Sequence, residues 1–395
     1  MSKLLRIPVV VFSIFLIFIS QSSAAPFVPP APKISAKAWA AIDYNTGTII
    51  AESNANTRLG PASLTKLMTA YVVFNEIKAG NISLSDQAMV SRNAWQKGQP
   101  TGGSHMFAKQ GSKISVKELL KGMIIVSGNE ASVALAEFIA GDETTFASVM
   151  NNYARKLGMT NTNFTNSTGW PDPEQYTSAL DIARLTQAMI HEFPEYYKWY
   201  SEKKYKYSGY QDDPRYREIK AQSNRNLLLW RNESVDGVKT GHTESDGYHL
   251  VASASQDNMR IITAVFGAKG KVARAVESQK LLKYGYRFFE TRKLFNAGEK
   301  LIETKIWKGK SDTLPLGLTE DIYITLPKRQ FKKLDVEHIL EPTITAPVLK
   351  SNTYGTLSIS VENNKLAEHP LVALQDINEG SLWKKMYDTV MLMMQ

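Results

Sequence analysis

Three short motifs follow one another along the chain, and each of them requires a different local structure. They are Ser63-Leu64-Thr65-Lys66, Ser127-Gly128-Asn129 and Lys239-Thr240-Gly241. Hydroxyl, amine and amide groups in this combination suit acyl transfer through a serine, provided that the fold brings all three motifs to one cleft. The motifs therefore constrain the fold more strongly than any other feature of the sequence.

The first motif lies where a helix is expected to begin. Pro61 precedes the serine, and apolar residues then recur three and four positions apart, at Leu64, Leu67, Met68, Tyr71 and Val72. This spacing predicts an amphipathic helix with one buried side. Ser63 would lie in the first turn, where unpaired N–H groups and the helix dipole favour an alkoxide. Lys66 shares its helix face and can act as base if burial and neighbouring cations lower its pKa from about 10.4.

The second motif stands between two apolar runs, 119–126 and 131–139. We expect a tight turn between two buried segments, with Gly128 supplying the backbone conformation that other residues resist. Ser127 can relay a proton between Lys66 and a leaving nitrogen, and Asn129 can orient an amide of the substrate.

The third motif precedes two alternating runs, 248–255 and 260–266, which predict adjacent antiparallel strands. A strand edge would present Lys239 and Thr240 to a cleft, and Gly241 lets a substrate backbone approach closely. The backbone N–H of His242 could join that of Ser63 as the second of two oxyanion donors.

No motif is specific by itself. Ser-x-x-Lys also occurs at 201–204 and 381–384, and Ser-x-Asn at 91–93. The three motifs taken singly have simpler explanations, namely a helix N-cap, a polar turn between helices and a plain β-turn. Ser201 lies in a charged run with no apolar stripe after it, and Ser381 begins the terminal helix, on whose polar side Lys384 is expected. We expect residues 91–93 to lie in a surface loop.

With the three motifs in this order, the sequence resembles the D-alanyl-D-alanine carboxypeptidases among the low-molecular-weight penicillin-binding proteins. These serine peptidases trim peptidoglycan stem peptides. The resemblance covers nearly the whole chain and includes the segments 43–47, 103–107, 121–131 and 274–278. It implies an acyl-enzyme on Ser63, release of the terminal D-Ala from pentapeptide stems, and acylation of the same serine by β-lactams.

The resemblance also implies a site for the terminal carboxylate of the substrate. Arg274 matches an arginine that performs this task in the family together with the threonine of the Lys-Thr-Gly motif, here Thr240. A guanidinium offers two donors in the geometry that a carboxylate accepts, although a solvated helix arginine is the simpler alternative.

The sequence departs from the family in one segment that the resemblance places in a wall of the active site. Relatives often carry a histidine in the segment that reads Asn166-Ser167-Thr168-Gly169-Trp170 here, and this chain has none there. Asp181 also matches the family, but a carboxylate at a helix N-terminus explains it more simply, and we leave it out of the catalytic set.

Other functions remain open at this point. A DD-endopeptidase acting on peptidoglycan cross-links and a class A β-lactamase share the motifs, and a catalytically silent wall-binding scaffold could retain them. A class A β-lactamase has no reason to carry the long C-terminal extension of this chain, and the same extension argues against an endopeptidase by analogy only.

Residues 1–24 predict a secretory signal peptide. Lys3 and Arg6 precede an uncharged apolar stretch at 7–19, and small residues occupy positions 22 and 24 before the expected cut. The stretch is too short for a mature transmembrane helix. Removal lowers the formal net charge from +9 to +7, since only these two residues of the segment are charged. We expect a periplasmic protein attached peripherally to the inner membrane.

The side chains available exclude several classes of site. The chain contains no cysteine, so it has neither disulfides nor a lipid-modified N-terminal cysteine. Its six histidines lack metal-ligand spacing, and we expect no metal and no cofactor. The excess of positive charge favours an anionic surface or an acidic polymer as partner, without the aromatic and basic interleaving of a nucleic-acid groove. The sequence gives no indication of the oligomeric state.

We expect an α+β fold with two domains and a terminal helix. A β-lactamase/transpeptidase-like catalytic domain would span 30–295, and a small β-rich domain 296–380, with a turn at Asn363-Asn364. From 381 to 395, Trp383, Tyr387 and several methionines share one helical side. Such a helix can lie in a membrane interface, although docking on its own domain or a dimer contact would also satisfy the pattern.

Overall fold

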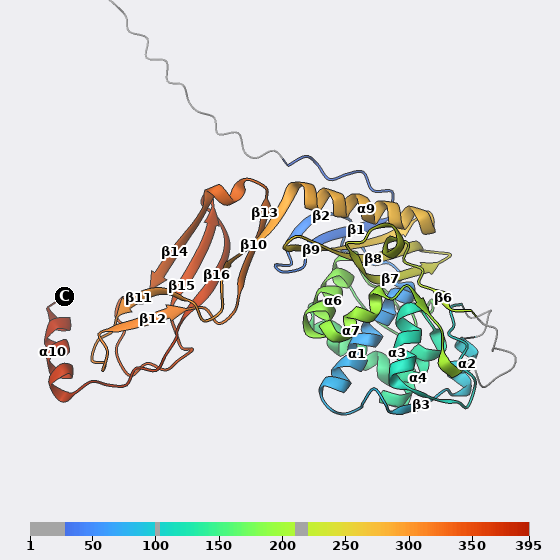
Figure 1. Cartoon of the computed structure of the whole chain (residues 1–395), viewed down its shortest axis with the longest axis horizontal. Helices are drawn as coiled ribbons and strands as arrows, with labels where there is room; N and C mark the ends of the chain where they lie inside the picture. Colours follow the sequence, from blue (N-terminus) through green and yellow to red (C-terminus); the bar gives the residue numbers. More distant parts are fainter. Residues whose placement is uncertain (1–27, 99–102, 210–219, 395) are drawn as a thin grey trace, which may run out of the picture.

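The structure is a computed structural model that describes residues 28–98, 103–209 and 220–394. The expected signal peptide lies outside these residues. A larger unit of mixed helices and strands is followed by a smaller β unit and a short terminal helix (Figure 1). The prediction of an α+β fold with a C-terminal all-β domain and a terminal helix is therefore confirmed.

An antiparallel sheet of five strands organises the larger unit. Its order is β2-β1-β9-β8-β7, with β1 at Ala38–Asp43, β2 at Ile49–Ser53, β7 at Val235–Thr243, β8 at Gly247–Gln256 and β9 at Met259–Ala268. The predicted pairing of the two alternating runs is confirmed by β8 and β9, which pair along their whole length. Strand β7, which carries the third motif, forms one edge of the sheet.

Helices cover both faces of this sheet. Strand β1 shows the alternation that this requires: Ala38, Ala40 and Ile42 join the core shared with the helical region, whereas Trp39 and Ala41 join the core under α9. Helix α9 (Lys271–Phe288) packs on β8 and β9. The helical region on the other face contains α1 (Thr65–Lys78), α2 (Arg92–Lys97), α3 (Val116–Ile125), α4 (Asn129–Ala140), α5 (Glu143–Lys156) and α6 (Ala179–Glu192). Short elements complete the unit: β3 (Gln87–Met89), β4 (Lys113–Ser115), α7 (Pro194–Tyr197), β5 (Lys204–Tyr205), β6 (Gln222–Ser223) and α8 (Leu228–Arg231).

Helix α1 lies at the centre of the helical region. The apolar stripe predicted for it is buried, but so is every residue from Thr65 to Phe74. The expectation of an amphipathic helix with one buried side was therefore wrong. The chain after Ser63 is surrounded by protein on all sides, which fixes the position of the first motif.

The smaller unit consists almost entirely of strands. A five-stranded sheet has the order β11-β12-β16-β15-β14, and β10 pairs with β13 beside it. The strands are β10 (Phe289–Phe295), β11 (Lys300–Lys305), β12 (Thr313–Gly317), β13 (Ile322–Pro327), β14 (Leu334–Leu340), β15 (Thr353–Val361) and β16 (Asn364–Ala373). The turn between β15 and β16 lies at Glu362 and Asn363, one residue earlier than predicted. Their φ angles of 50° and 67° suit a two-residue hairpin turn with both central residues left-handed.

A small polar cluster joins the two units. The buried carboxylate of Asp43 accepts hydrogen bonds from Thr46 at 2.9 Å and from Thr291 at 2.7 Å. The hydroxyl of Thr325 lies 2.8 Å from that of Thr46 and 2.9 Å from that of Thr291. The hairpin turn after β1 is thereby joined to β10 and β13, and the polar side chains at the contact between the units have hydrogen-bond partners.

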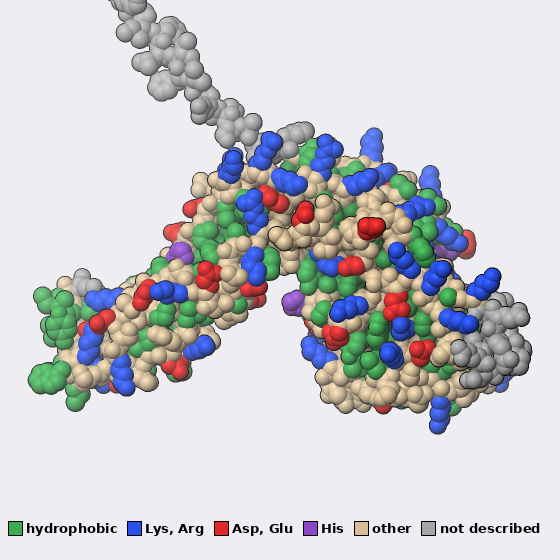
Figure 2. Space-filling model, in the orientation of Figure 1, with side chains coloured by type: hydrophobic (Ala, Val, Ile, Leu, Met, Phe, Trp, Pro, Cys, Tyr) green, Lys and Arg blue, Asp and Glu red, His purple; other side chains and the backbone are tan. Residues whose placement is uncertain are grey.

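The terminal helix α10 (Leu382–Met393) docks through its polar side. Asp388 is buried and accepts hydrogen bonds from the Lys308 backbone N–H and from the Lys384 amine. The apolar side chains face outward at the tip of the smaller unit, and Trp383 is 81% exposed (Figure 2). Across the described ranges, no helix combines the length and the apolar character that crossing a bilayer requires.

Candidate active site

A cavity of about 720 Å³ lies between the edge strand β7 and the helical region. Seven of the nine predicted site residues line it: Ser63, Ser127, Asn129, Thr240, Gly241, His242 and Arg274. The remaining two, Lys66 and Lys239, lie directly behind the lining, and each contacts a lining serine. The three motifs therefore meet at one place, as the sequence analysis required.

Ser63 is held in a tight turn before α1. It lies in a short 3-10 helix, Ala62–Leu64, and Ala62 has a φ of 48°. Gly169 packs against this turn so closely that a Cβ atom on it would lie 1.7 Å from the Ala62 carbonyl oxygen. Gly169 itself has a φ of +86°, so the wall segment needs a glycine both for its backbone and for this contact.

Lys66 is buried beside Ser63, with only 1% of its surface exposed. Its Nζ lies 3.1 Å from Ser63 Oγ, 2.8 Å from Asn129 Oδ1 and 2.7 Å from the Thr168 carbonyl oxygen. Burial, and next the nearby Arg225 cation, lower the pKa of Lys66 to about 7. The lowered pKa makes the neutral amine accessible near neutral pH, in contact with the Ser63 hydroxyl.

Ser127 occupies the turn between α3 and α4. The positive φ of this turn, 65°, belongs to Ser127, whereas Gly128 has an ordinary φ of −55°. The expectation that Gly128 supplies the unusual conformation was therefore wrong. Gly128 instead allows close packing, because a Cβ atom there would lie 3.2 Å from the backbone nitrogen of Met106. Ser127 is one of ten non-glycine residues with a positive φ in the described part of the chain, and it lines the cavity.

Strand β7 brings the third motif to the opposite side of the cavity. Lys239 Nζ donates to Ser127 Oγ at 2.8 Å. Burial and the charge of Lys66 hold the pKa of Lys239 well below its usual value. Gly241 faces the segment before the nucleophile, where a Cβ atom would come within 3.1 Å of the Pro61 carbonyl oxygen. The His242 ring lies against the ring of Tyr248, with 4.0 Å between centroids.

Arg274 reaches the cavity from the first turn of α9. Its guanidinium donates to the carbonyl oxygens of Gly241 at 2.9 Å and His249 at 3.2 Å. Burial, and next Arg225, lower the pKa of Arg274 to about 10, so it stays charged at neutral pH. The solvated arginine considered as the alternative does not describe this side chain, which is only 4% exposed.

Sequence reasoning missed several residues of the cavity. Arg225 lines it and bonds to the Ser104 hydroxyl through Nη1. Trp170 forms part of the wall, with the Lys97 amine 5.3 Å from its ring centroid. No motif surrounds Arg225, and only the fold brings it to the site. The cations of Arg225 and Arg274 give the cavity a positive field that suits an anionic substrate.

The other copies of the motifs have local structural roles. Ser91 caps α2 by accepting from the Ala94 N–H, so the expected surface loop at 91–93 is in fact the start of a helix. Ser381 caps α10 in the same way. Ser201 donates to the Lys198 carbonyl oxygen at 2.7 Å. Within the described part of the chain, no cluster of three or more His, Cys, Asp or Glu side chains could hold a metal ion.

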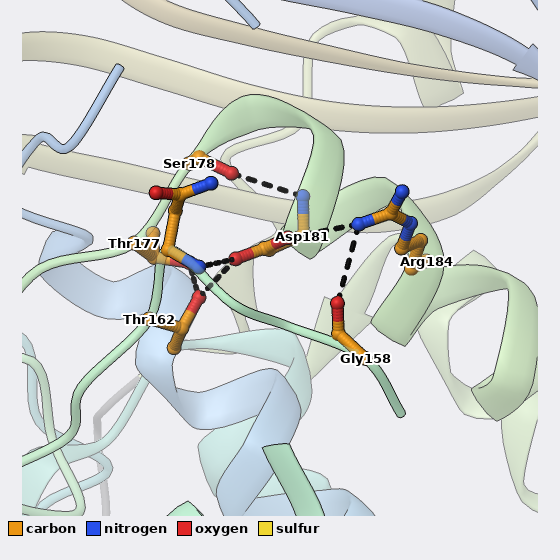
Figure 3. Close-up of polar contacts among 7 residues, drawn as sticks. Gly158, Thr162, Thr177, Ser178, Asp181 and Arg184 are labelled. Carbon is orange, nitrogen blue, oxygen red and sulfur yellow. Dashed lines mark hydrogen bonds and ion pairs between the residues drawn. The ribbon is translucent and has the colours of Figure 1, made fainter. Parts of the chain in front are cut away.

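Asp181 lies apart from the cavity, in the first turn of α6. Its carboxylate accepts from the Thr162 hydroxyl at 2.9 Å and from the Asn161 N–H at 2.8 Å, and it pairs with Arg184 (Figure 3). Arg184 in turn donates to the Gly158 carbonyl oxygen. These contacts join the start of α6 to the loop after α5, so Asp181 has a structural role there.

Comparison with known proteins places this geometry in a family. The D-alanyl-D-alanine carboxypeptidase family of peptidases (S11) matches residues 25–270, and the C-terminal domain of penicillin-binding protein 5 matches residues 289–379. The D-alanyl-D-alanine carboxypeptidases DacC and DacA of Escherichia coli K12 are each 40% identical to this chain. The alignment with DacC covers 95% of this chain and 92% of DacC. The alignment with DacA covers 93% of this chain and 89% of DacA.

Solved structures agree with these sequence matches. Penicillin-binding protein 5 from Haemophilus influenzae has a TM-score of 0.81 and 39% identity, covering 89% of this chain and all of that one. Penicillin-binding protein D2 from Listeria monocytogenes in an ampicillin-bound form covers 65% of this chain and all of its own, with a TM-score of 0.55 and 26% identity. The chain belongs to the D-alanyl-D-alanine carboxypeptidase family, the low-molecular-weight penicillin-binding proteins, and is a serine-type hydrolase.

Proposed function

We propose that Ser63 is the nucleophile of this carboxypeptidase and that neutral Lys66 is its general base. The observation that carries the proposal is the set of three contacts of the buried Lys66 nitrogen. A neutral amine has two N–H donors and one lone pair. Its donors would bond to Asn129 and the Thr168 carbonyl, which leaves the lone pair to accept the proton of Ser63.

The reaction would then proceed through an acyl-enzyme. The Ser63 oxygen attacks the carbonyl carbon of the penultimate D-Ala, while the backbone N–H groups of Ser63 and His242 stabilise the oxyanion. Ser127 passes a proton to the nitrogen of the departing D-Ala, and Lys239 holds the Ser127 hydroxyl in place. Water hydrolyses the ester and releases the shortened stem peptide.

The remaining predicted residues would bind the substrate. Thr240 and Arg274 both line the cavity, and a guanidinium suits the terminal carboxylate of the substrate. Asn129 would orient the peptide amide, and Gly241 would let the substrate backbone approach β7. A β-lactam would acylate Ser63 by the same attack, and ampicillin is bound in the D2 structure from Listeria.

Two assays test the proposal. A fluorescent penicillin should label the wild-type protein and fail to label Ser63→Ala, and an unlabelled wild type would contradict it in favour of a silent scaffold. Release of free D-Ala from a pentapeptide, compared with cleavage of a cross-linked dimer, distinguishes carboxypeptidase from endopeptidase preference. Rapid turnover of the penicillin itself would instead favour a β-lactamase.

We also propose that residues 1–24 direct secretion and that the mature protein lies in the periplasm with α10 on the inner membrane. Support comes from the outward apolar side of α10, where Leu382, Trp383 and Met393 are all at least 75% exposed. Aromatic and aliphatic side chains on one side of a short helix suit the interface of a bilayer. Deletion of 381–395 should move the protein into the soluble fraction, and unchanged membrane fractionation would reject the anchor.

The domain limits complete the proposal. We expected a catalytic domain at 30–295 and a β-rich domain at 296–380. Strand β10 pairs with β13, and the match to the C-terminal domain of penicillin-binding protein 5 begins at residue 289. Both observations favour a boundary one strand earlier, at the end of α9. Expression of 28–288 alone, followed by penicillin labelling, tests whether that segment folds and reacts without β10.

A further inference from the structure

Glu130 is a buried carboxylate that the reaction described above does not use. It follows Asn129 in the first turn of α4 and is only 1% exposed. Gly98 makes room for it, because a Cβ atom on this glycine would lie 2.7 Å from the Glu130 carboxyl carbon. A buried carboxyl group in a space that a glycine leaves open needs a reason, since burying charge is costly.

The Glu130 carboxylate fastens one wall of the cavity to the turn that carries Ser127. Its Oε1 accepts the backbone N–H groups of Met106 at 2.8 Å and Ala108 at 3.2 Å. Both N–H groups converge on one oxygen while Phe107 between them has a φ of 69°, which is unfavourable for a side-chain-bearing residue. The Asn129 N–H donates to the Ser104 carbonyl oxygen at 2.8 Å, so segment 104–108 is held at both ends by the start of α4.

We propose that Glu130 is a positioning residue for the carboxypeptidase reaction, which fixes segment 104–108 against the Ser127–Asn129 turn and thereby sets the side of the substrate cleft that lies opposite β7. Ser104 lines the cavity beside Arg225, and Asn129 contacts the Lys66 amine. A shift of segment 104–108 relative to α4 would therefore displace the wall of the substrate site that contains Ser104. It would also disturb Asn129, which accepts a hydrogen bond from Lys66.

The charge of Glu130 also acts on Lys66. Three ionisable groups from separate elements influence the Lys66 pKa: Arg225 disfavours its cation, whereas Glu130 and Glu143 favour it. The charge of Lys66 in turn lowers the pKa of Lys239. Burial raises the pKa of Glu130 itself to about 7, against the opposing effect of the backbone N–H groups that it accepts. Its Oε2 has no hydrogen-bond partner among the described residues. Removal of this carboxylate should therefore lower the pKa of Lys66 further.

The test uses the full mature chain and three variants. Glu130→Gln keeps an oxygen for both N–H groups and removes the charge. Glu130→Ala removes the acceptor altogether. Glu137→Gln removes a carboxylate from the same helix, where Glu137 accepts only from the Asn93 amide near the surface. The rate constant for acylation by a fluorescent penicillin is measured from pH 5 to 9, with KM and kcat for D-Ala release and Tm for each variant.

For Glu130→Gln we expect Tm close to the wild-type value and an acidic limb of the acylation profile that moves to lower pH. For Glu130→Ala we expect kcat/KM to fall about tenfold or more, since two buried donors lose an acceptor. Glu137→Gln should leave the profile and kcat/KM unchanged. If Glu130→Ala does not fold, kcat/KM of Glu130→Gln decides, since a variant that keeps the acceptor should stay close to the wild type.

An unchanged kcat/KM in Glu130→Ala overturns the inference. So does a kcat/KM of Glu130→Gln as low as that of Glu130→Ala, because glutamine keeps the oxygen that both N–H groups need. The inference rests on Ser63 being the acylated nucleophile. Absence of label on the wild-type protein, or persistence of label on Ser63→Ala, would instead overturn the proposed site. The two failures are therefore distinguishable in the same set of measurements.

Discussion

The side-chain nitrogen of Lys239 lies 2.8 Å from the hydroxyl oxygen of Ser127, although 112 positions separate the two residues in the sequence. One residue comes from the edge strand of the sheet and the other from the turn between α3 and α4. Both are at least 96% buried. A hydrogen bond in such a dry setting is stronger than at a surface, and the loss of either partner leaves the other without its contact.

This contact predicts strong coupling between the two residues. Ser127→Ala and Lys239→Ala should each lower kcat/KM for D-Ala release by about a hundredfold or more, because each removes part of one proton path. The double variant should be little worse than the poorer single variant, as expected for groups that act as a unit. A double-mutant cycle on kcat/KM measures this directly, and additive losses would show that the two side chains act independently.

The acylation rate should depend on the protonation of Lys66. Its pKa is lowered to about 7 by burial and by Arg225. The basic, neutral form therefore predominates above about pH 7, and the rate constant for acylation by a β-lactam should rise with pH through this value and then level off. Stopped-flow acylation measured at several pH values tests this.

Lys66→Arg provides the matched control for the pH dependence, because arginine keeps the charge but does not lose its proton in this range. Acylation of this variant should be at least a thousandfold slower, on the order expected for loss of a general base and the geometry it maintains. A wild-type rate that falls as pH rises through 7 would contradict a neutral Lys66.

Much of the site could be predicted because its motifs are local. Each motif sits at a junction that apolar patterns mark in sequence, such as the end of α3 before Ser127 or the alternating strands after Gly241. Their convergence could be predicted as well, because the three motifs suit acyl transfer only if the fold brings them to one cleft. The family resemblance added Arg274, which no local pattern distinguishes from an exposed helix residue.

The parts that sequence reasoning missed depend on contacts between distant segments. Arg225 stands in a segment without periodicity, and only the packing of that segment beside β7 and α9 places it in the cavity. The left-handed backbone of Ser127 was assigned to Gly128, because residue preference was weighed without the crowding imposed by Met106. Helix α1 was expected to have an exposed side, since burial of its second side depends on α4, α5 and α6 packing around it.

Gly169 should tolerate no side chain. Gly169→Ala would place a methyl group 1.7 Å from the Ala62 carbonyl oxygen and would also strain a backbone with φ of +86°. We expect a loss of about 3 kcal/mol or more in the free energy of unfolding, and slower penicillin acylation because the turn carrying Ser63 must move. Urea unfolding and acylation rates measure the two effects.

Gly158→Ala is the control for Gly169→Ala. Gly158 also has a positive φ, +67°, but a Cβ atom there would meet no atom within 4 Å. It should lose only about 1 kcal/mol, the cost of the left-handed backbone alone, and its acylation rate should match that of the wild type. Equal destabilisation by the two substitutions would show that the contact between Gly169 and Ala62 has no special importance.

The docking of α10 should depend on Asp388. This carboxylate is 1% exposed and accepts from the Lys308 backbone N–H and the Lys384 amine, so Asp388→Ala leaves two partly buried donors without this acceptor. Such a loss costs about 1–3 kcal/mol, which is large for a helix of 12 residues held by few other buried contacts. Hydrogen exchange of the segment 382–393 should therefore become much faster, with the rest of the chain unchanged.

Thr389→Ala is the control, because the Thr389 hydroxyl donates to the Lys385 carbonyl oxygen within the helix. Equal protection of α10 in Asp388→Ala and in the wild type would mean that the helix is held by contacts other than its polar side.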